Sequence, residues 1–384
     1  MSESQSLIES GLSVVIPTYK RVQMCETLLD SLKTSQAFCD IPTEVWVMDD
    51  SPTPDAQRIK AACDRHHFNY CWQSGPVTTK RNLGAKNARY PIVCFIDSDC
   101  IATPELLQRH CDCYHHHSEV VAVIGKTEFK GPQTWLWHVI ELTPYLDAFA
   151  IADFPTQIVW GPSNNFSCRK TIFKQLGGFD ENCPQPIGGE DAELGYRLYH
   201  EGYMMHTCPE AVVYHSTETW NTLPQVLQRL TRWSRGDIYL KRRNWISLYY
   251  SCPSRLGTVL ILIPLAISIS LTTQNYVWLS WPLLFIIFNF ILGALQKLAA
   301  YPPRFLHPFR IFAAESLILF YDLQNAWQCL RWNCWKLLFT YLLLRPEDAH
   351  LLWNENMKQL SIRGFELGTS LTFLLTYQDY VFGR

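Results

Sequence analysis

Two aspartates, Asp97 and Asp99, stand one residue apart where an apolar run ends, in the stretch PIVCFIDSDC. Residues i and i+2 of an extended strand point to the same face, so the two carboxylates are predicted to converge on one point. Neighbouring carboxylates repel each other unless a cation lies between them, and Mg²⁺ or Mn²⁺ takes carboxylate and phosphate oxygens as ligands. The pair therefore predicts a divalent metal site, with capping of a helix before Pro104 as the alternative.

Three other polar segments are expected at the same edge of a sheet. They read PTYKR over 17–21, DDS over 49–51 and TKRNLG over 79–84. In open α/β sheets, ligands bind beyond the carboxyl ends of the strands. Carboxylates and hydroxyls there can bond a base and a ribose, and Lys80 and Arg81 can hold phosphate charge. For the second segment, a simple turn is the alternative.

The elements that position these groups alternate between short β-branched runs and amphipathic stretches, which is typical of βαβ units around a parallel sheet. Strands are predicted over 12–19, 44–50, 68–73 and 92–96, and helices over 21–33, 55–67 and 80–88. The strands are almost entirely apolar, so helices must cover both faces of the sheet. No Gly-x-Gly-x-x-Gly follows the first strand, which argues against a dinucleotide-dependent dehydrogenase.

Length and charge narrow the class of protein. The chain has 384 residues, enough for one domain of roughly 200 to 250 residues and a further region. Its net charge is -2, with 33 basic and 35 acidic residues, so nucleic acid is not an expected partner. The 14 cysteines form no Cys-x-x-Cys pair, and residues 1–11 lack the apolar core of a signal peptide. These features favour a reducing, cytosolic environment.

A cluster of histidines and cysteines over 110–117, HCDCYHHH, contains possible zinc ligands. The cluster follows Thr103, Pro104 and Glu105, an N-cap, a proline and an early acid that predict the start of a helix. The spacing is poor for closing a tetrahedron around zinc. A continuing helix is therefore the prediction, and a structural zinc site is the alternative.

Two long apolar stretches without charge occupy residues 256–273 and 276–295. The second has about the 20 residues that a bilayer requires, and only a tight turn separates the two, so they predict a transmembrane hairpin. Basic residues flank both outer ends, which places both ends on the cytoplasmic side. A buried helical hairpin in a soluble domain is the alternative.

Beyond the hairpin, residues 310–344 alternate apolar runs with polar residues and carry Trp327, Trp332 and Trp335. Tryptophan beside lysine and arginine is typical of helices that lie in the membrane interface. An interfacial helical region is therefore predicted, with a third span or a re-entrant segment as the alternative.

Further along the chain stand SNNFSCRK, LGGFDE and GGEDAELGYRL, which follow VIPTYKR, MDDS, KRNLGA and FIDSD in order. In this order the motifs, over residues 12–235, resemble the family 2 glycosyltransferases. The resemblance implies an α/β domain of the GT-A fold, with a mixed, mainly parallel sheet flanked by helices. It also implies inversion at the sugar, a nucleotide-sugar donor and an Mg²⁺ or Mn²⁺ cofactor.

The resemblance also implies a role for each matching position. Asp191 falls on the catalytic base and Glu190 stands beside it. The implied metal ligands are Asp97, Asp99 and His215, although His215 can also be an ordinary histidine at a strand end. The donor contacts implied are Pro17, Thr18, Tyr19, Arg21, Asp49, Asp50, Lys80, Arg81, Asn82, Asp97, Ser98 and Asn165.

The segment LQRLTRWSRG over 227–236 resembles the Gln-x-x-Arg-Trp motif of cellulose, hyaluronan and chitin synthases. This chain has Arg229 where those enzymes have glutamine, which puts a polymerase-like role in doubt. Arg232 can still bind diphosphate and Trp233 can stack on a sugar. An amphipathic interface helix with arginines at lipid headgroups is the alternative.

Taken together, the motifs predict a membrane-associated enzyme that moves a sugar, from UDP-sugar or a similar donor, to a lipid or membrane-linked glycan at the cytoplasmic face. A processive polysaccharide synthase and a non-catalytic, membrane-tethered binding protein are the alternatives, and oligomers are possible. The predicted organisation is a polar extension (1–11), the glycosyltransferase domain (12–235), a basic linker (236–255), the hairpin (256–295) and an interfacial region (296–384).

Overall fold

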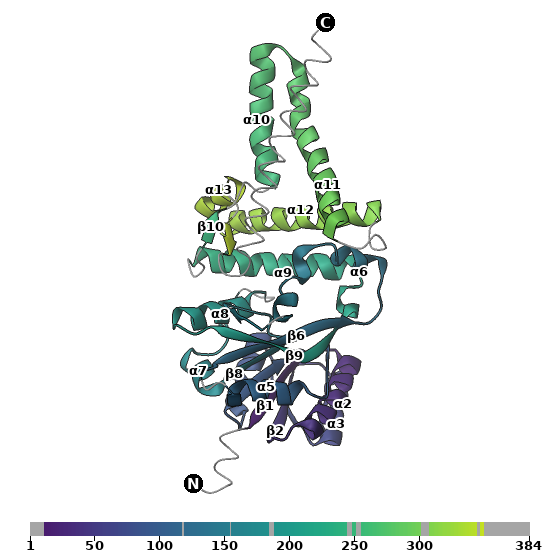
Figure 1. Cartoon of the computed structure of the whole chain (residues 1–384), viewed down its shortest axis with the longest axis vertical. Coiled ribbons are helices and arrows are strands. Elements are labelled where there is room, and N and C mark those ends of the chain that lie inside the picture. Colours follow the sequence, from purple (N-terminus) through teal and green to yellow (C-terminus); the bar gives the residue numbers. More distant parts are fainter. Residues whose placement is uncertain are drawn as a thin grey trace. The chain divides into compact units, whose positions relative to one another are not determined.

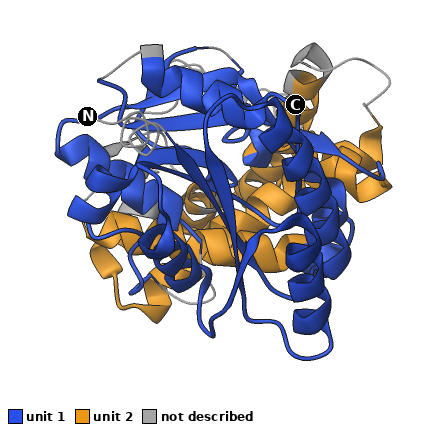
Figure 2. Cartoon of the chain, turned by 90° about the horizontal axis from the view of Figure 1, so that it is seen from below, with its two compact units in different colours: residues 1–133, 145–225 blue, residues 134–144, 226–384 orange. Residues whose placement is uncertain are grey.

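The structure is a computed structural model. It describes residues 11–116, 119–153, 155–183, 188–243, 248–250, 255–300, 307–343 and 346–348. Most of the predicted polar extension, parts of the basic linker and the last 36 positions of the interfacial region, 349–384, lie outside the described residues. The chain forms two compact units (Figure 2), of which one comprises residues 1–133 and 145–225 and the other residues 134–144 and 226–384.

One large sheet organises the first unit (Figure 1). Its strands lie in the order β3-β2-β1-β4-β8-β6-β9-β5, with β7 paired to β9. The strands are β1 (Leu12–Thr18), β2 (Thr43–Asp49), β3 (Asn69–Trp72), β4 (Ile92–Ile96), β5 (Cys100–Ala102), β6 (Ala122–Lys130), β7 (Gln157–Ile158), β8 (Asn165–Arg169) and β9 (Met205–Ser216).

The sheet is mixed and mainly parallel, as predicted. β1, β2, β3 and β4 pair in parallel, as do β6 and β9, and most paired residues belong to these ladders. β8 runs antiparallel to both β4 and β6, and β5 runs antiparallel to β9. β4 therefore separates a parallel part of the sheet from a mixed part.

Helices cover both faces of the sheet because alternate strand residues point to opposite sides. On one face, side chains such as Val14 and Cys94 pack against three helices, and on the other face Val15 and Phe95 pack against three more. The first three are α2 (Val22–Phe38), α3 (Asp55–His66) and α5 (Leu106–His116). The second three are α4 (Val77–Asn87), α7 (Lys170–Gln175) and α8 (Glu190–His200).

The histidine and cysteine cluster belongs to α5, so the prediction of a helix is confirmed for residues 110–116, and His117 lies outside the described residues. His110 is fully buried, and its ring nitrogens lie 2.9 Å from Ser167 Oγ and 2.9 Å from Asn165 Oδ1. Burial lowers the pKa of His110 to about 4. His110 is therefore a neutral hydrogen-bonding residue of the core, and no zinc cluster forms within the described part of this helix.

The second unit is helical in its described residues, apart from the short antiparallel pair β10 (Leu248–Tyr250) and β11 (Pro346–Asp348). α12 packs against α6, α10, α11 and α13. The helices are α6 (Trp135–Ile140), most of α9 (Leu223–Arg242), α10 (Arg255–Thr273), α11 (Trp281–Ala300), α12 (Pro308–Arg331) and α13 (Trp335–Leu343).

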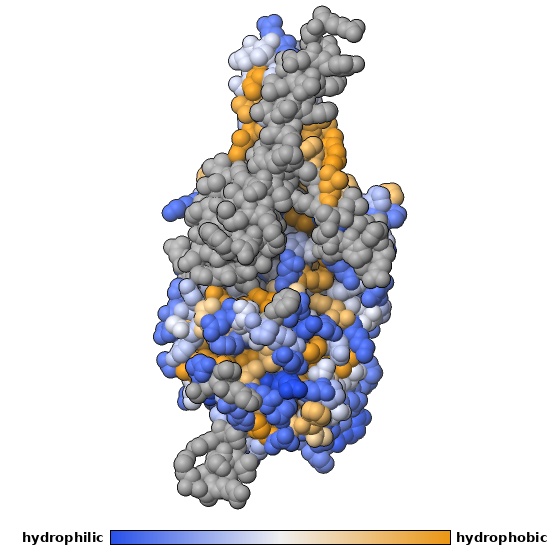
Figure 3. Space-filling view, in the orientation of Figure 1, coloured by the Kyte–Doolittle hydropathy of each residue, from blue (hydrophilic) through white to orange (hydrophobic). Residues whose placement is uncertain are grey.

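The two predicted apolar segments are the helices α10 and α11, which pack on each other through residues such as Leu262, Trp281 and Phe285. Asn275 caps the connection, because its side chain accepts a hydrogen bond from Val277 N. The outer surface of both helices is apolar (Figure 3). By length and composition, one segment of the described chain, Tyr276–Leu295, is long and apolar enough to cross a membrane, and the helical segment Gly257–Thr273 is shorter.

α12 buries polar as well as apolar side chains and exposes large apolar ones, which is unusual for a helix of a water-soluble protein. Its buried face carries Glu315, Asp322, Asn325 and Gln328, whereas its exposed residues include Phe312 and Trp327. Glu315 forms an ion pair with Lys297 of α11, and both side chains are buried. The ion pair joins the end of the apolar helix α11 to α12.

Candidate active site

The predicted polar segments meet at one edge of the sheet. β1 ends at Thr18, β2 ends at Asp49 and β4 is followed by Asp97, and the three strands are parallel. Carboxyl ends of parallel strands lie at the same edge, so the side chains that follow them share one region. All the candidate site residues belong to the first compact unit, except Arg232 and Trp233 of α9.

Asp49 is fully buried and accepts hydrogen bonds at the carboxyl end of β2. Its Oδ1 accepts hydrogen bonds from Ser51 N at 2.9 Å and Ser51 Oγ at 2.6 Å, and its Oδ2 accepts one from Tyr70 Oη at 3.0 Å. Burial and the bond to Asp49 raise the pKa of Tyr70, which therefore stays a hydrogen-bond donor. Trp72 Nε1 donates to Ser51 O at 3.2 Å while the indole stays largely exposed. An exposed ring beside buried acceptors suits a flat, polar ligand such as a base.

Lys80 links the first two strand ends. Its Nζ lies 2.5 Å from Asp50 Oδ1 and donates to Thr18 O at 2.8 Å, although Lys80 is nearly buried. The ammonium group neutralises Asp50 and holds the ends of β1 and β2 together. The structure therefore brings the segments 17–21, 49–51 and 79–84 together, as predicted.

Arg81 joins two of the predicted carboxylates. Its Nη2 lies 2.7 Å from Asp97 Oδ1 and its Nη1 lies 2.9 Å from Glu190 Oε1. Burial lowers the pKa of Arg81, but the charges of Asp97 and Glu190 outweigh burial and raise it overall. The guanidinium is therefore permanently charged and fixes Glu190 of α8 against the loop after β4.

Asp97 and Asp99 do not share one face of an extended strand, so that part of the prediction is wrong. Cys100 N donates to Asp97 O at 3.0 Å, which closes a tight turn over 97–100 between β4 and β5. The Asp97 carboxylate, 30% exposed, faces Arg81, whereas Asp99, 2% exposed, lies 2.8 Å from Arg21 Nη1. The turn changes direction because β5 leaves β4 to pair with β9, on the far side of the sheet.

Asp99 forms a candidate metal group with His215 and Cys100, whose ligand atoms lie within 4.8 Å of one another. His215 Nε2 is 3.6 Å from Asp99 Oδ2, because β9 pairs Cys100 with His215. Burial and the charge of Asp99 raise the pKa of the Cys100 thiol well above its usual value, which makes it a poor ligand. A carboxylate and an imidazole suit Mn²⁺, and a carboxylate with a diphosphate suits Mg²⁺, so this donor set fits either ion.

Asp191 stands in the first turn of α8, after Gly189, which has a positive φ of 88°. Its Oδ1 accepts a hydrogen bond from Ala192 N at 2.9 Å. Burial, followed by the charge of Glu190, raises the pKa of Asp191 to about 7. A carboxylate with a pKa near neutrality is suited to general-base chemistry.

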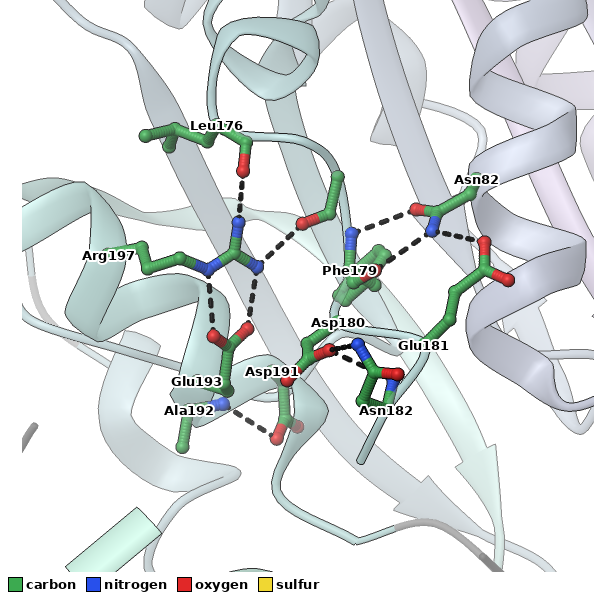
Figure 4. Close-up of polar contacts among 11 residues, drawn as sticks. Asn82, Leu176, Phe179, Asp180, Glu181, Asn182, Asp191, Ala192, Glu193 and Arg197 are labelled. Atoms are coloured by element: carbon green, nitrogen blue, oxygen red, sulfur yellow. Dashed lines mark hydrogen bonds and ion pairs between the residues drawn. The ribbon is translucent and has the colours of Figure 1, made fainter. Parts of the chain in front are cut away.

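A loop before α8 ties that helix to α4 (Figure 4). Asn82 of α4 bonds the backbone of Phe179 and the side chain of Glu181. Arg197 of α8 donates to Gly178 O at 2.6 Å and forms a two-point ion pair with Glu193, which is fully buried. The motifs LGGFDE and GGEDAELGYRL are thus joined in space.

The remaining predicted residues occupy varied positions. Pro17 is in β1, Tyr19 is exposed beyond it, and Ser98 is buried in the turn after β4. The Asn165 amide is buried and donates to Lys126 O at 3.0 Å and Ala211 O at 2.8 Å. Arg232 and Trp233 lie on α9, in the second unit. The donor-binding role of these residues stays a prediction.

The sequence reasoning missed Tyr70 and Trp72 on one side of the site and the pair Arg197 and Glu193 on the other. Tyr70 and Trp72 are two residues apart near the carboxyl end of β3, so they share a face. The rule that ligands bind beyond the carboxyl ends of strands, which selected Asp49, could therefore have found them. Arg197 follows Glu193 by four residues on a helix, a spacing that favours an ion pair. No sequence signal shows that this pair also reaches the loop over 176–178.

A family model described as "Glycosyltransferase like family 2" matches residues 10–236 of the chain. The chain is 29% identical over 230 residues, 52% of its length and 54% of the relative's, to validoxylamine A glucosyltransferase of Streptomyces hygroscopicus subsp. jinggangensis. It is 28% identical over 250 residues to chondroitin synthase of Escherichia coli, with 55% of this chain and 35% of that one covered. The chain thus spans about half or less of the length of these relatives.

Among solved structures, a mannosyltransferase from Pyrobaculum calidifontis in complex with GDP-Man and Mn²⁺ matches with a TM-score of 0.44. The two chains are 15% identical, and the match covers 86% of this chain and 84% of the other.

Proposed function

Because the chain belongs to the glycosyltransferase-like family 2, we propose that it transfers a sugar from a nucleotide-sugar donor, with a UDP-sugar as the first choice, to an acceptor hydroxyl. The observation that carries this proposal is the pair of ion pairs that Arg81 forms at the carboxyl edge of the sheet, with Asp97 and with Glu190, the neighbour of Asp191, 109 positions further along the chain. The glucosyltransferase and the synthase among its relatives support the same class of reaction.

Asp191 is the proposed base. It takes the proton from an acceptor hydroxyl, and the resulting oxygen attacks the anomeric carbon of the donor sugar as the bond from that carbon to the diphosphate breaks. The nucleoside diphosphate leaves with the bonding electrons, and a single displacement inverts the anomeric carbon. Arg81 neutralises the charge of Glu190 in an ion pair. The proton-accepting role is therefore assigned to Asp191, the neighbour of Glu190, whose pKa of about 7 suits it.

The diphosphate is proposed to lie between the turn over 97–100 and the N-terminal half of α4. Asp99 and His215 would hold an Mg²⁺ or Mn²⁺ ion, which supplies positive charge beside the departing diphosphate. Arg21 is a second cation at the same carboxylate and its side chain is 40% exposed, so it can turn toward an incoming phosphate. The base and ribose are proposed to lie against the exposed indole of Trp72, next to the buried Asp49 that fixes the end of β2.

The second unit supports a membrane location for the acceptor. α11 rises about 30 Å at 1.5 Å per residue over its 20 residues, which matches the apolar thickness of a bilayer. The outward apolar surface of α10 and α11 and the exposed apolar side chains of α12 are favourable against lipid and costly against water. We therefore propose a lipid or membrane-linked glycan as the acceptor, with the first unit on the cytoplasmic side.

The test is a screen of nucleotide sugars for release of nucleoside diphosphate, run with and without a membrane lipid extract. The proposal predicts release with one donor class that rises when the correct lipid is present. Long polymer from the purified protein would instead favour a processive synthase, for which the similarity to a chondroitin synthase is the supporting observation. Binding of a nucleotide sugar without any release of product, across all donors and lipids, would contradict the proposal and indicate a binding protein.

The raised pKa of Asp191 predicts how the rate depends on pH. Only the ionised carboxylate can accept a proton, so kcat/KM is expected to rise about tenfold per pH unit up to about pH 7 and to level off above it. Nucleotide affinity, measured by calorimetry at each pH, is the control that separates titration of the terminal phosphate, at about pH 6, from titration of the base. A profile that is flat between pH 5 and pH 7 would contradict the assignment of the base.

Membrane insertion of α11 predicts the effect of charges on its outer face. Ile287 and Ile291 are 46% and 49% exposed within the unit, on successive turns. Arginine at both positions should cost roughly 5 to 7 kcal/mol of insertion and move protein from the carbonate-washed membrane fraction to the soluble or aggregated fraction. The double change to leucine is the matched control. Equal membrane retention of both variants would contradict a spanning role for this helix.

A further inference from the structure

The loop over 176–183 is held by α4 on one side, and Asn82 makes most of that connection (Figure 4). Asn82 Nδ2 donates to Phe179 O and to Glu181 Oε1, both at 2.9 Å, and its Oδ1 accepts from Phe179 N at 2.8 Å. An asparagine has two side-chain N–H groups, and here both are used within the protein. Asn82 therefore has no N–H left for a donor molecule.

A second contact and a glycine make this connection tight. Thr79, one turn before Asn82 on α4, donates from Oγ1 to Glu181 Oε2 at 2.7 Å. Gly178 has a φ of +75°, and a Cβ at that position would lie 2.5 Å from Asn82 Oδ1. Only glycine allows the loop to approach the asparagine this closely in that conformation.

The same loop is held by α8 on its other side. Arg197 donates from Nη1 to Leu176 O at 2.5 Å and from Nη2 to Gly178 O at 2.6 Å. Its two-point ion pair with Glu193 fixes the guanidinium, because Glu193 is fully buried. The loop is thus a rigid spacer between α4 and α8.

The loop also lies beside residues of the candidate active site. Arg81, next to Asn82, bonds Glu190 in the first turn of α8 at 2.9 Å, and its guanidinium lies 5.3 Å from the centre of the Phe179 ring. α4 and α8 are therefore joined at two places, through Arg81 and through the loop. A shift of the loop would move the support beneath Arg81 and, through Arg197, the helix that carries Asp191.

We propose that Asn82 is a positioning residue that sets the place of Asp191 relative to the donor-binding helix α4. This role differs from the donor contact that the family resemblance implies for Asn82, and it rests on the proposed glycosyl transfer only for its effect on rate. In this role Asn82 touches neither donor nor acceptor. It acts through Phe179 and Glu181 on the loop, and through the loop on α8.

The proposal is tested with Asn82→Asp, which keeps the shape of the side chain but removes both N–H groups and places a carboxylate against Glu181. We expect kcat to fall about 10- to 100-fold, since displacement of a catalytic group by an ångström costs this much, while the affinity for UDP measured by calorimetry stays unchanged. Asn87→Asp is the matched control, because Asn87 lies exposed on the same helix and the same substitution there should change neither quantity.

A second substitution separates positioning from binding. In the double variant Asn82→Asp with Glu181→Gln, the new amide can donate to the new carboxylate, whereas the bond to Phe179 O is not restored, so kcat should recover in part. Amide hydrogen exchange should become faster over 176–183 and over the first turn of α8 in the single variant and return toward the wild-type rate in the double variant.

The outcomes distinguish this proposal from the proposed function. A weaker affinity for UDP in Asn82→Asp without rescue by Glu181→Gln would show that Asn82 contacts the donor, and the positioning role would be wrong. Faster exchange confined to the loop, with the first turn of α8 unchanged, would also overturn it. If the wild-type protein transfers no sugar, the proposed function fails, whereas the exchange measurements still decide whether Asn82 positions α8.

Discussion

Replacement of Asp191 by asparagine should reduce sugar transfer by about 10²- to 10⁴-fold, the usual contribution of a general base. Asparagine has nearly the same shape and can still accept the hydrogen bond from Ala192 N, so α8 should keep its start. It has no basicity, so the acceptor hydroxyl keeps its proton. The measurement is kcat with the donor and acceptor identified by the screen, together with the affinity for UDP, which should stay unchanged.

Asp64→Asn provides the control for the loss of one negative charge, because Asp64 is 61% exposed and pairs with Lys60 on the surface. That variant should keep full activity. Near-normal turnover of the Asp191→Asn protein, with donor free of contaminating enzyme, would show that another group accepts the proton. Glu190 would be the next residue to test, although its bond to Arg81 favours a structural role.

Replacement of Asp99 by alanine should weaken both sugar transfer and nucleotide binding, whereas the change at Asp191 should affect transfer alone. Asp99 is the buried carboxylate of the candidate metal group, and a divalent ion at a leaving diphosphate is worth several kcal/mol, or roughly 10²-fold or more in rate. We expect a lower kcat and a lower affinity for UDP in the presence of Mn²⁺. The affinity for UDP in EDTA should be similar in the two proteins, because neither then has a bound ion.

The comparison with EDTA makes this prediction specific to the ion. If Asp99 acts through a metal, the chelator should lower the activity of the wild type and have no further effect on Asp99→Ala. If Asp99 acts only as the partner of Arg21, chelation should reduce both proteins by the same factor. Asp64→Asn again serves as the charge control.

The arrangement of strand ends could be predicted because it depends on local patterns. Apolar runs of five to seven residues ending in polar groups marked β1, β2 and β4 to within a residue, and β4 coincides with the predicted Ile92–Ile96. Parallel pairing then requires that the groups after these strands share an edge. One predicted helix start is wrong: α4 begins at Val77 and not at Lys80, because Pro76 is extended and Val77, Thr78 and Thr79 are already helical.

The contacts that complete the candidate site could not be predicted, because they join distant parts of the chain. The Arg81 to Glu190 bond spans 109 positions and the Asn82 to Phe179 bonds span 97. Periodicity and spacing report only on neighbours within an element. The turn over 97–100 shows the same limit, since its cause is the pairing of β5 with β9 and not the sequence IDSDC itself.

The pairing of β5 with β9 also bears on the order of folding. β1 to β4 and their helices precede β5 and β9 in the chain, so they are synthesised first. Cys100 meets His215 only after more than a hundred further residues have been made. Contacts of such separation form late and slowly. We therefore expect the candidate metal group of Asp99 and His215 to be completed late in folding, when β9 joins the sheet.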